Sequence, residues 1–236
     1  MKKAVAAMSA IAVAVIVLAS GCTTVIKDAT ATPPKVEKLT QASINERVPK
    51  ANFFGSNTTE PDDFQTKWMY FCSGEKYPAT DSIKGVEPYA KGYTAKGSLP
   101  FNAERGDFGV NVYALPDKKA ATSLADNAIS DMKNCKDTDN SDGGSGDTAY
   151  TIKSKNKEQD YSHGAWQGYA IHTESVYTPS NGGDKEDSTI LAVVAYRANV
   201  VALLNIYAYK PDSNKTALDK STTLVDKFLD ALDNKK

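Results

Sequence analysis

The residues that could support hydrolysis or bind zinc are few and poorly spaced. His163 and His172 are the only histidines, and neither pairs at a short metal-ligand spacing with a second histidine or a free cysteine. The G-x-S-x-G nucleophile motif is absent, because the run 143–146 of Gly-Gly-Ser-Gly continues with Asp147. A Ser-His-Asp group assembled only in space stays open. We therefore expect a non-enzymatic protein, with an exported hydrolase as the less favoured alternative.

Two acidic loops deserve a test as metal sites. The loop 137–147 carries acidic or hydroxyl oxygens at alternate positions, as a calcium loop does at its start. The sixth and twelfth positions hold Asp142 and Thr148, whereas an EF-hand needs glycine and glutamate there. The loop 181–187 is similar in composition. We interpret both as solvated turns and predict no metal site. No G-x-G-x-x-G motif opens a helix after a strand and no P-loop occurs, so we expect no cofactor.

Aromatic residues offer a different kind of chemistry, the stacking of apolar or sugar ligands. The candidates for such a surface are Tyr70, Tyr77, Tyr89, Tyr93, Trp166, Tyr169 and Tyr177. Packing in a core or an interface accounts for them equally well. No individual ligand-binding residue is therefore predicted.

Charge and composition limit the partners. The 236 residues include 28 Lys plus Arg and 29 Asp plus Glu, a formal net charge of -1. Without a basic field, nucleic acid is a disfavoured partner. A hydrophobic fraction of 41% and a charged fraction of 24% are ordinary for one soluble domain with additions.

The N-terminus has the layout of an export signal. Lys2 and Lys3 precede an uncharged run, 4–20, that ends in Leu-Ala-Ser-Gly before Cys22. This ending resembles the bacterial lipobox, although Ala19 stands where a large aliphatic residue is usual. The resemblance implies removal of residues 1–21 and acylation of Cys22, which would anchor the protein in the lipid bilayer on the extracytoplasmic side of the cell membrane. An uncleaved anchor helix is the alternative.

The next segment, residues 22–63, is rich in Thr, Ala and Pro and lacks a sustained apolar period. We expect a lipidated, flexible tether, followed by one domain over residues 64–236. The alternative is that Phe53-Phe54 docks on the domain as an edge strand.

Periodicity within the domain predicts an α+β fold. Apolar residues at helical spacing predict amphipathic helices over about 117–135 and after Ser213 to the C-terminus. Alternation predicts strands at 108–112 and 166–176, and a hairpin of 190–196 with 200–209. We expect Asn199 to take the left-handed conformation in the hairpin loop. Together these elements predict an antiparallel sheet with two amphipathic helices packed on it.

The number of cysteines in the exported protein indicates a disulfide. Once Cys22 is lipidated only Cys72 and Cys135 remain, so we predict one disulfide between them. A redox-active pair is the alternative, but the C-x-x-C spacing that lowers a thiol pKa is missing.

The chain resembles the PknH-like extracellular sensor domain, a family found on actinobacterial kinases and as free lipoproteins. The resemblance rests on the Ala-rich helix 120–132 ending near Cys135 and on the apolar run 191–201. It implies an antiparallel sheet with packed helices and a cleft for an unidentified ligand. Such domains commonly carry two disulfides, and a glycine often stands at the position of Ala198.

These observations favour a membrane-anchored extracytoplasmic lipoprotein with a sensor-like domain that binds a small molecule, glycan or lipid. The alternative is a cell-envelope structural or protein-interaction lipoprotein without a small ligand. A concave apolar cavity would favour the first hypothesis and a flat patch the second.

Overall fold

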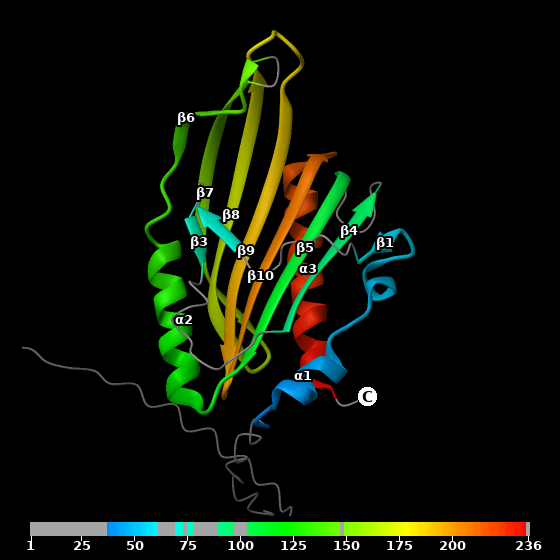
Figure 1. The fold of residues 1–236 in the computed structure, drawn as a ribbon, viewed down its shortest axis with the longest axis vertical. Helices are drawn as coiled ribbons and strands as arrows, with labels where there is room; N and C mark the ends of the chain where they lie inside the picture. Colours follow the sequence, from blue (N-terminus) through cyan, green and yellow to red (C-terminus); the bar gives the residue numbers. More distant parts are fainter. Residues whose placement is uncertain are drawn as a thin grey trace, which may run out of the picture. The chain divides into compact units, whose positions relative to one another are not determined.

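The computed structural model describes residues 37–60, 69–72, 75–77, 89–96, 103–146 and 149–234, all within one compact unit, Val36–Lys236. Its elements in chain order are α1 (Gln41–Arg47), a 3-10 helix η1 (Ala51–Phe54), β1 (Thr58–Thr59), β2 (Met69–Cys72), β3 (Glu75–Tyr77), β4 (Tyr89–Lys96), β5 (Ala103–Ala114), α2 (Lys118–Met132), β6 (Thr138–Gly143), β7 (Tyr150–His163), β8 (Trp166–Pro179), β9 (Glu186–Arg197), β10 (Val200–Pro211) and α3 (Asn214–Asp233). The fold is α+β (Figure 1).

One antiparallel sheet of eight strands forms the framework, in the order β1-β4-β5-β10-β9-β8-β7-β6. A second sheet pairs β2 with β3. The central strand β10 pairs with β5 on one side and with β9 on the other. Most of its residues are apolar and buried, as expected for a strand whose two faces are both covered. The hairpin β9–β10 agrees with the predicted strands, and the apolar run is not a membrane helix. No described helix is long and apolar enough to cross a bilayer.

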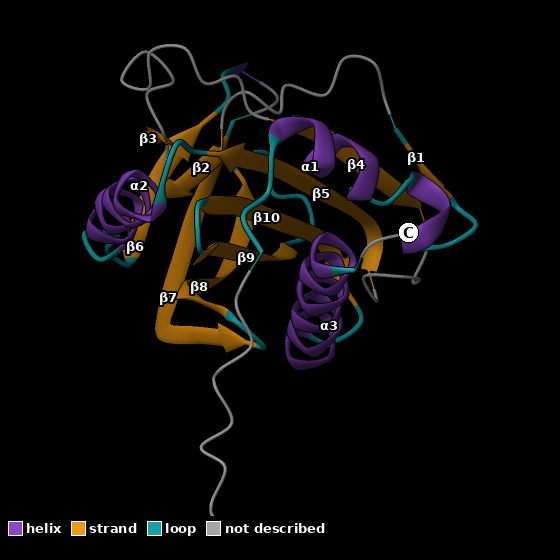
Figure 2. Ribbon diagram, turned by 90° about the horizontal axis from the view of Figure 1, so that it is seen from below, coloured by secondary structure: helices purple, strands orange, loops and turns teal. Residues whose placement is uncertain are grey.

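The two long helices cover opposite faces of the sheet (Figure 2). α3 packs on Val193, Ala195 and Leu204, whereas α2 packs on the residues of opposite parity, among them Val194 and Leu203. Strand alternation therefore gives the sheet two cores. Both helices begin as capping predicts, since the side chains of Asp117 and Ser213 accept hydrogen bonds from backbone N–H groups of the first turn. The structure adds a third helix, α1, to the two predicted.

The predicted tether is too long at its C-terminal end. Residues 37–60 lie on the domain, and Leu39, Ile44, Val48 and Phe54 are buried in the core on the α3 side of the sheet. The physical reason is burial, since four large apolar side chains gain too much from leaving water to stay in a linker. Phe54 docks through a 3-10 helix, not through the edge strand considered above. Residues 1–36, including the predicted signal and Cys22, lie outside the described residues.

Asn199 joins this N-terminal segment to the β9–β10 turn. Its Oδ1 accepts a hydrogen bond from the Leu39 N–H at 3.0 Å, and its Nδ2 donates to the carbonyls of Leu39 and Leu115, both at 2.8 Å. The expectation that Asn199 takes the left-handed conformation is wrong. Ala198 does so, with φ at 44°, because Asn199 is committed to these buried bonds.

Charged groups reinforce the same junction. Arg47 on α1 donates to the carbonyl of Leu232 at 2.9 Å and to the carboxylate of Glu37 at 3.1 Å. The Nε of Arg197, at the end of β9, lies 2.6 Å from the Oδ1 of Asp233, near the end of α3. Both arginines are buried, so each needs its partners. The first described residues are thereby fixed to the hairpin turn and to α3.

Candidate functional site

A cavity of about 350 Å³ opens on the α2 side of the sheet, beyond the part that α2 covers. Four tyrosines dominate its wall, and we call it the tyrosine cavity. The lining residues come from β7, β8, β9, β10 and the residue before β7, and they are Ala149, Tyr150, Tyr177, Pro179, Glu186, Tyr207 and Tyr209. Its volume lies at the lower end of the range for small-ligand sites.

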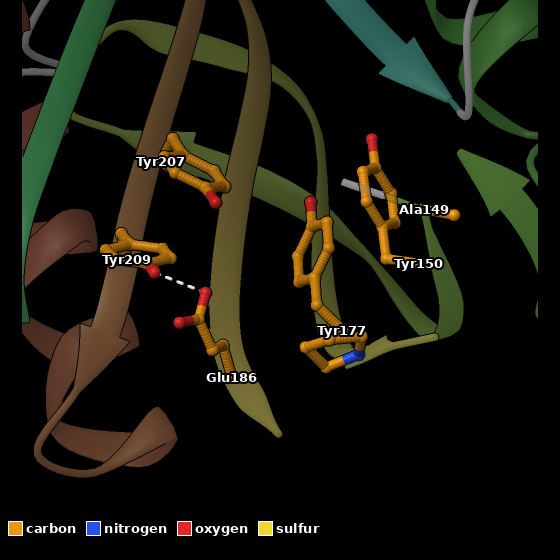
Figure 3. Close-up of a pocket in the computed structure, with 7 residues that line it drawn as sticks. Ala149, Tyr150, Tyr177, Glu186, Tyr207 and Tyr209 are labelled. Carbon is orange, nitrogen blue, oxygen red and sulfur yellow. Dashed lines mark hydrogen bonds between the residues drawn. The ribbon is translucent and has the colours of Figure 1, made fainter. Parts of the chain in front are cut away.

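Sheet register brings these residues together. Tyr177 on β8 is directly opposite Glu186 on β9, and Tyr150 on β7 is opposite Pro179. Tyr207 and Tyr209 share the parity of Leu203, so they lie on the same face as the α2 core but further along β10. Figure 3 shows Tyr207 and Tyr209 on one side of the cavity and Tyr150 and Tyr177 on the other.

The aromatic rings form both sides of an open cleft. The rings of Tyr150 and Tyr177 meet edge to face with centroids 5.5 Å apart, a favourable geometry for aromatic pairs. In Figure 3 the Tyr207 hydroxyl points across the cavity towards the side where Tyr177 stands. Burial raises the pKa of Tyr207. The nearby phenol of Tyr177 raises this pKa further, whereas the hydrogen bond with Ser188 lowers it. The Tyr207 hydroxyl therefore stays protonated and can donate a hydrogen bond.

Glu186 forms a polar wall with two residues of β10. The Tyr209 hydroxyl donates a hydrogen bond to the Glu186 carboxylate, and the Lys210 ammonium lies 2.9 Å from it. Both bonds lower the pKa of Glu186, and the hydrogen bond from Tyr209 has the larger effect. The carboxylate is therefore ionised at neutral pH. The same contacts raise the pKa of Lys210. The Glu186 carboxylate and the Lys210 ammonium are thus already paired, and Lys210 also lies 3.9 Å from the carboxylate of Glu104.

The backbone of Lys210 has an uncommon conformation that brings its side chain to Glu186. Strand alternation would place its side chain on the face opposite to Tyr209. With φ at 46°, Lys210 instead has its ammonium 5.1 Å from the centre of the Tyr209 ring as well as beside Glu186. A left-handed conformation is uncommon for residues other than glycine, and such outliers concentrate at functional sites.

Of the predicted surface aromatics whose side chains the structure describes, only Tyr177 lines the tyrosine cavity. Tyr93, Trp166 and Tyr169 are core residues, and Tyr89 packs against the core. The side chains of Tyr70 and Tyr77 lie outside the described residues. Sequence reasoning missed Tyr150, Tyr207 and Tyr209. The available signal was a change along one parity of β10, from aliphatic Val201 and Leu203 to tyrosines.

The histidines lie apart from the tyrosine cavity. The His163 ring contacts two carboxylates of α3, Asp230 at 2.7 Å and Asp226 at 3.6 Å. His172 is buried in β8, and this burial lowers its pKa. Neither residue lines the tyrosine cavity.

The acidic loops and the cysteines have separate places. Residues 138–143 form β6 at the edge of the sheet, and the described residues contain no group of three or more His, Cys, Asp or Glu side chains placed to bind a metal. Cys135 is 8% exposed and belongs to the α2 core. The side chain of Cys72 lies outside the described residues, so its pairing with Cys135 stays a prediction.

A second hollow, of about 340 Å³, lies on the N-terminal segment and is called the Phe53 hollow. It is lined by Arg47, Pro49, Lys50, Asn52, Phe53 and Ala231. Phe53 is 43% exposed and is the one large hydrophobic side chain exposed among the described residues.

The sequence matches no protein-family model and no curated protein. Among solved structures, the extracellular domain of PknH from Mycobacterium tuberculosis is similar to this chain, with a TM-score of 0.47 and 12% sequence identity. The similarity covers 83% of this chain and 99% of that one. The similarity is distant.

Proposed function

We propose that this protein is a lipid-anchored extracytoplasmic lipoprotein whose domain binds a small ligand in the tyrosine cavity without transforming it. The observation that carries the proposal is the cavity itself. It combines apolar rings, protonated hydroxyls and one prearranged ion pair in a concave site of ligand size. A flat surface adapted only to protein contact would lack this concavity.

A binding role without catalysis is supported by the kinds of residue that line the cavity. The single carboxylate, Glu186, is held by Tyr209 and Lys210, and the other lining residues are tyrosines, alanine and proline. A general base needs a pKa near the operating pH, whereas the pKa of Glu186 is lowered. The lining therefore favours recognition over acid–base chemistry.

Anchoring is supported by the N-terminal sequence, where a charged start, an apolar run and Cys22 follow one another. Two or more acyl chains would make the attachment lasting. Metabolic labelling with palmitate should mark the wild-type protein at the membrane and should fail to mark Cys22→Ser. An equally labelled Cys22→Ser protein would contradict lipidation at this residue.

We also propose the disulfide between Cys72 and Cys135. It is supported by the contact of α2, the helix that precedes Cys135, with β2, the strand that ends at Cys72. Closing the loop between Cys72 and Cys135 contributes about 4 kcal/mol to the free energy of unfolding in the chain-entropy model. The exported protein should therefore be 2 Da lighter than its reduced form, and reduction should lower its unfolding midpoint. Free thiols on both cysteines after oxidising export would contradict the pairing.

The Phe53 hollow favours a second candidate function, contact with a protein of the cell envelope. An exposed phenylalanine beside Lys50 offers an apolar anchor with a polar rim. If this were the main function, Phe53→Ala would abolish partner capture while changes in the tyrosine cavity would have no effect.

Native mass spectrometry tests the binding function. The chain from residue 23, exported through an oxidising compartment, should carry a non-covalent mass that denaturation removes. Tyr177→Ala should lose this mass, because it removes a ring from the cavity wall. Tyr196→Phe is the matched control, since Tyr196 lies on the α2 side of the sheet outside the cavity. A mass retained in Tyr177→Ala, or none in wild type under any growth condition, would contradict the proposal.

A further inference from the structure

The tyrosine cavity has a chemical character that narrows its ligand. This inference rests on the proposed function, because it assumes that the cavity is the binding site. Three properties decide the class: the balance of charge on the wall, the hydroxyl groups on the rings, and the size.

The charge balance disfavours ionic ligands. Lys210 lies 2.9 Å from Glu186 and 5.1 Å from the Tyr209 ring centre, so it already occupies the position that a cationic ligand would take. An anionic ligand would meet the ionised Glu186 carboxylate, whose countercharge is already engaged. Among the described lining residues no charge remains to pair with an ion. A neutral ligand therefore fits the wall without disrupting it.

The hydroxyls disfavour a purely apolar ligand. All four aromatic lining residues are tyrosines, and each brings a phenolic group that is both donor and acceptor. Figure 3 shows the hydroxyl of Tyr209 turned to Glu186, and the Tyr207 hydroxyl interacts with those of Tyr177 and Ser188. An acyl chain filling the cavity would exclude water from these groups and leave part of their donor and acceptor capacity unused, which costs binding free energy. Phenylalanine would serve such a chain better.

The ligand should therefore offer apolar C–H faces and several hydroxyls at once. A sugar ring has this composition, with C–H groups that stack on aromatic rings and hydroxyls around its edge. A cavity of about 350 Å³ accommodates one or two such rings. The lone polar wall then fixes orientation, since the ionised Glu186 carboxylate is a strong acceptor for a sugar hydroxyl.

We propose that the tyrosine cavity binds a neutral sugar unit, stacked on the Tyr150–Tyr177 side and hydrogen-bonded to the polar wall of Glu186 and Tyr209. The sugar is either free or the end of a longer glycan, because the cavity opens to solvent. Tyr207 closes the opposite side and donates from its protonated hydroxyl.

Saturation-transfer NMR with defined probes tests the proposal on the exported chain from residue 23. The neutral probes are methyl glycosides of glucose, galactose, arabinose, rhamnose and N-acetylglucosamine, together with maltose. The contrasting probes are p-cresol, choline and octanoate. We expect at least one neutral sugar to bind, and its Kd to rise about tenfold or more in Tyr177→Ala, because a stacking ring is lost.

Tyr177→Phe separates the ring from its hydroxyl and retains the packing that folding requires. It should raise the sugar Kd by about threefold, which corresponds to the loss of one hydrogen bond. Tyr196→Phe should leave the Kd unchanged. Circular dichroism of each variant establishes that it folds.

The outcomes distinguish the two levels of the argument. Binding of p-cresol, choline or octanoate that depends on Tyr177, with no sugar bound, would overturn the sugar assignment while supporting the tyrosine cavity as a ligand site. If no probe bound and the native mass spectrum were also bare, the proposed binding function itself would fall. Sugar binding unaffected by Tyr177→Ala would place the sugar elsewhere and would also overturn the inference.

Discussion

Replacing Asn199 by alanine should loosen the junction between the N-terminal segment and the domain. The substitution removes three hydrogen bonds, two to Leu39 and one to the Leu115 carbonyl, at 2.8 to 3.0 Å. Asn199 is 3% exposed, so water does not replace the lost partners without local opening. The backbone bond from the Leu115 N–H to the Asn199 carbonyl remains.

The magnitude follows from these bonds. Each contributes about 1 kcal/mol net, and groups left buried without a partner cost about 1–3 kcal/mol each. Local opening limits the total, because the Leu39 backbone can move out to water. We expect a loss of about 3 kcal/mol in the free energy of unfolding for Asn199→Ala. The stability lost should come with exposure of residues 37–48, whose apolar side chains pack on the α3 side.

Urea denaturation and limited proteolysis measure the two consequences. The free energy of unfolding should fall by about 3 kcal/mol, and cleavage within residues 37–48 should become faster under native conditions. Asn134→Ala is the control, since Asn134 is exposed on the end of α2 and should shift stability by less than about 0.5 kcal/mol. If Asn199→Ala matched this control in both assays, the argument that Asn199 fixes the N-terminal segment would be refuted.

Three further changes test the packing of the sheet. Burial lowers the pKa of His172, so the unfolded state takes up a proton that the folded state refuses. Stability should decline as the pH falls below about 6.5, and His172→Gln should reduce this decline in urea titrations at pH 7.5 and 5. Gly168→Ala should destabilise the domain by about 2 kcal/mol or more in thermal unfolding, because its Cβ would lie 1.8 Å from the Val194 carbonyl oxygen. Asp233→Asn should lower the unfolding free energy by about 2 kcal/mol, because it leaves the buried Arg197 without its ion-pair partner. A difference within error of wild type for any one variant would contradict the contact it tests.

Local periodicity predicted the long elements. The apolar positions of α2 and α3 recur at helical spacing, and the apolar run 190–209 is interrupted at its turn and once within β10, at Asn205. These patterns arise because one face of each element is buried, so the pattern is visible within the sequence of the element itself. The α+β class and the antiparallel hairpin followed directly.

The N-terminal segment was mispredicted because its partners are distant in sequence. Leu39 and Asn199 are 160 positions apart, and a single buried leucine carries no period. The surrounding Thr, Ala and Pro residues have the composition of a linker, which composition alone cannot distinguish from a docked strap. The burial of the segment's apolar side chains and its hydrogen bonds to Asn199 reveal the docking.

The tyrosine cavity was missed for a related reason. Tyr150, Tyr177 and Tyr207 lie on three different strands, and only the pairing register places them on one face. The left-handed backbone of Lys210 is equally invisible in a sequence, because lysine gives no sign of it. Sites assembled from register and strain require the structure.

Tyrosine-selective NMR tests ligand binding in the tyrosine cavity most directly. With ¹³C-labelled tyrosine rings assigned through single Tyr→Phe variants, the exported chain is titrated with the neutral glycosides and with a polar extract of cell envelope. We predict that the resonances of Tyr150, Tyr177, Tyr207 and Tyr209 shift together and saturably, while that of the core residue Tyr93 stays fixed. Saturable shifts confined to tyrosines outside the cavity, or no shift with any glycoside or extract, would contradict the account.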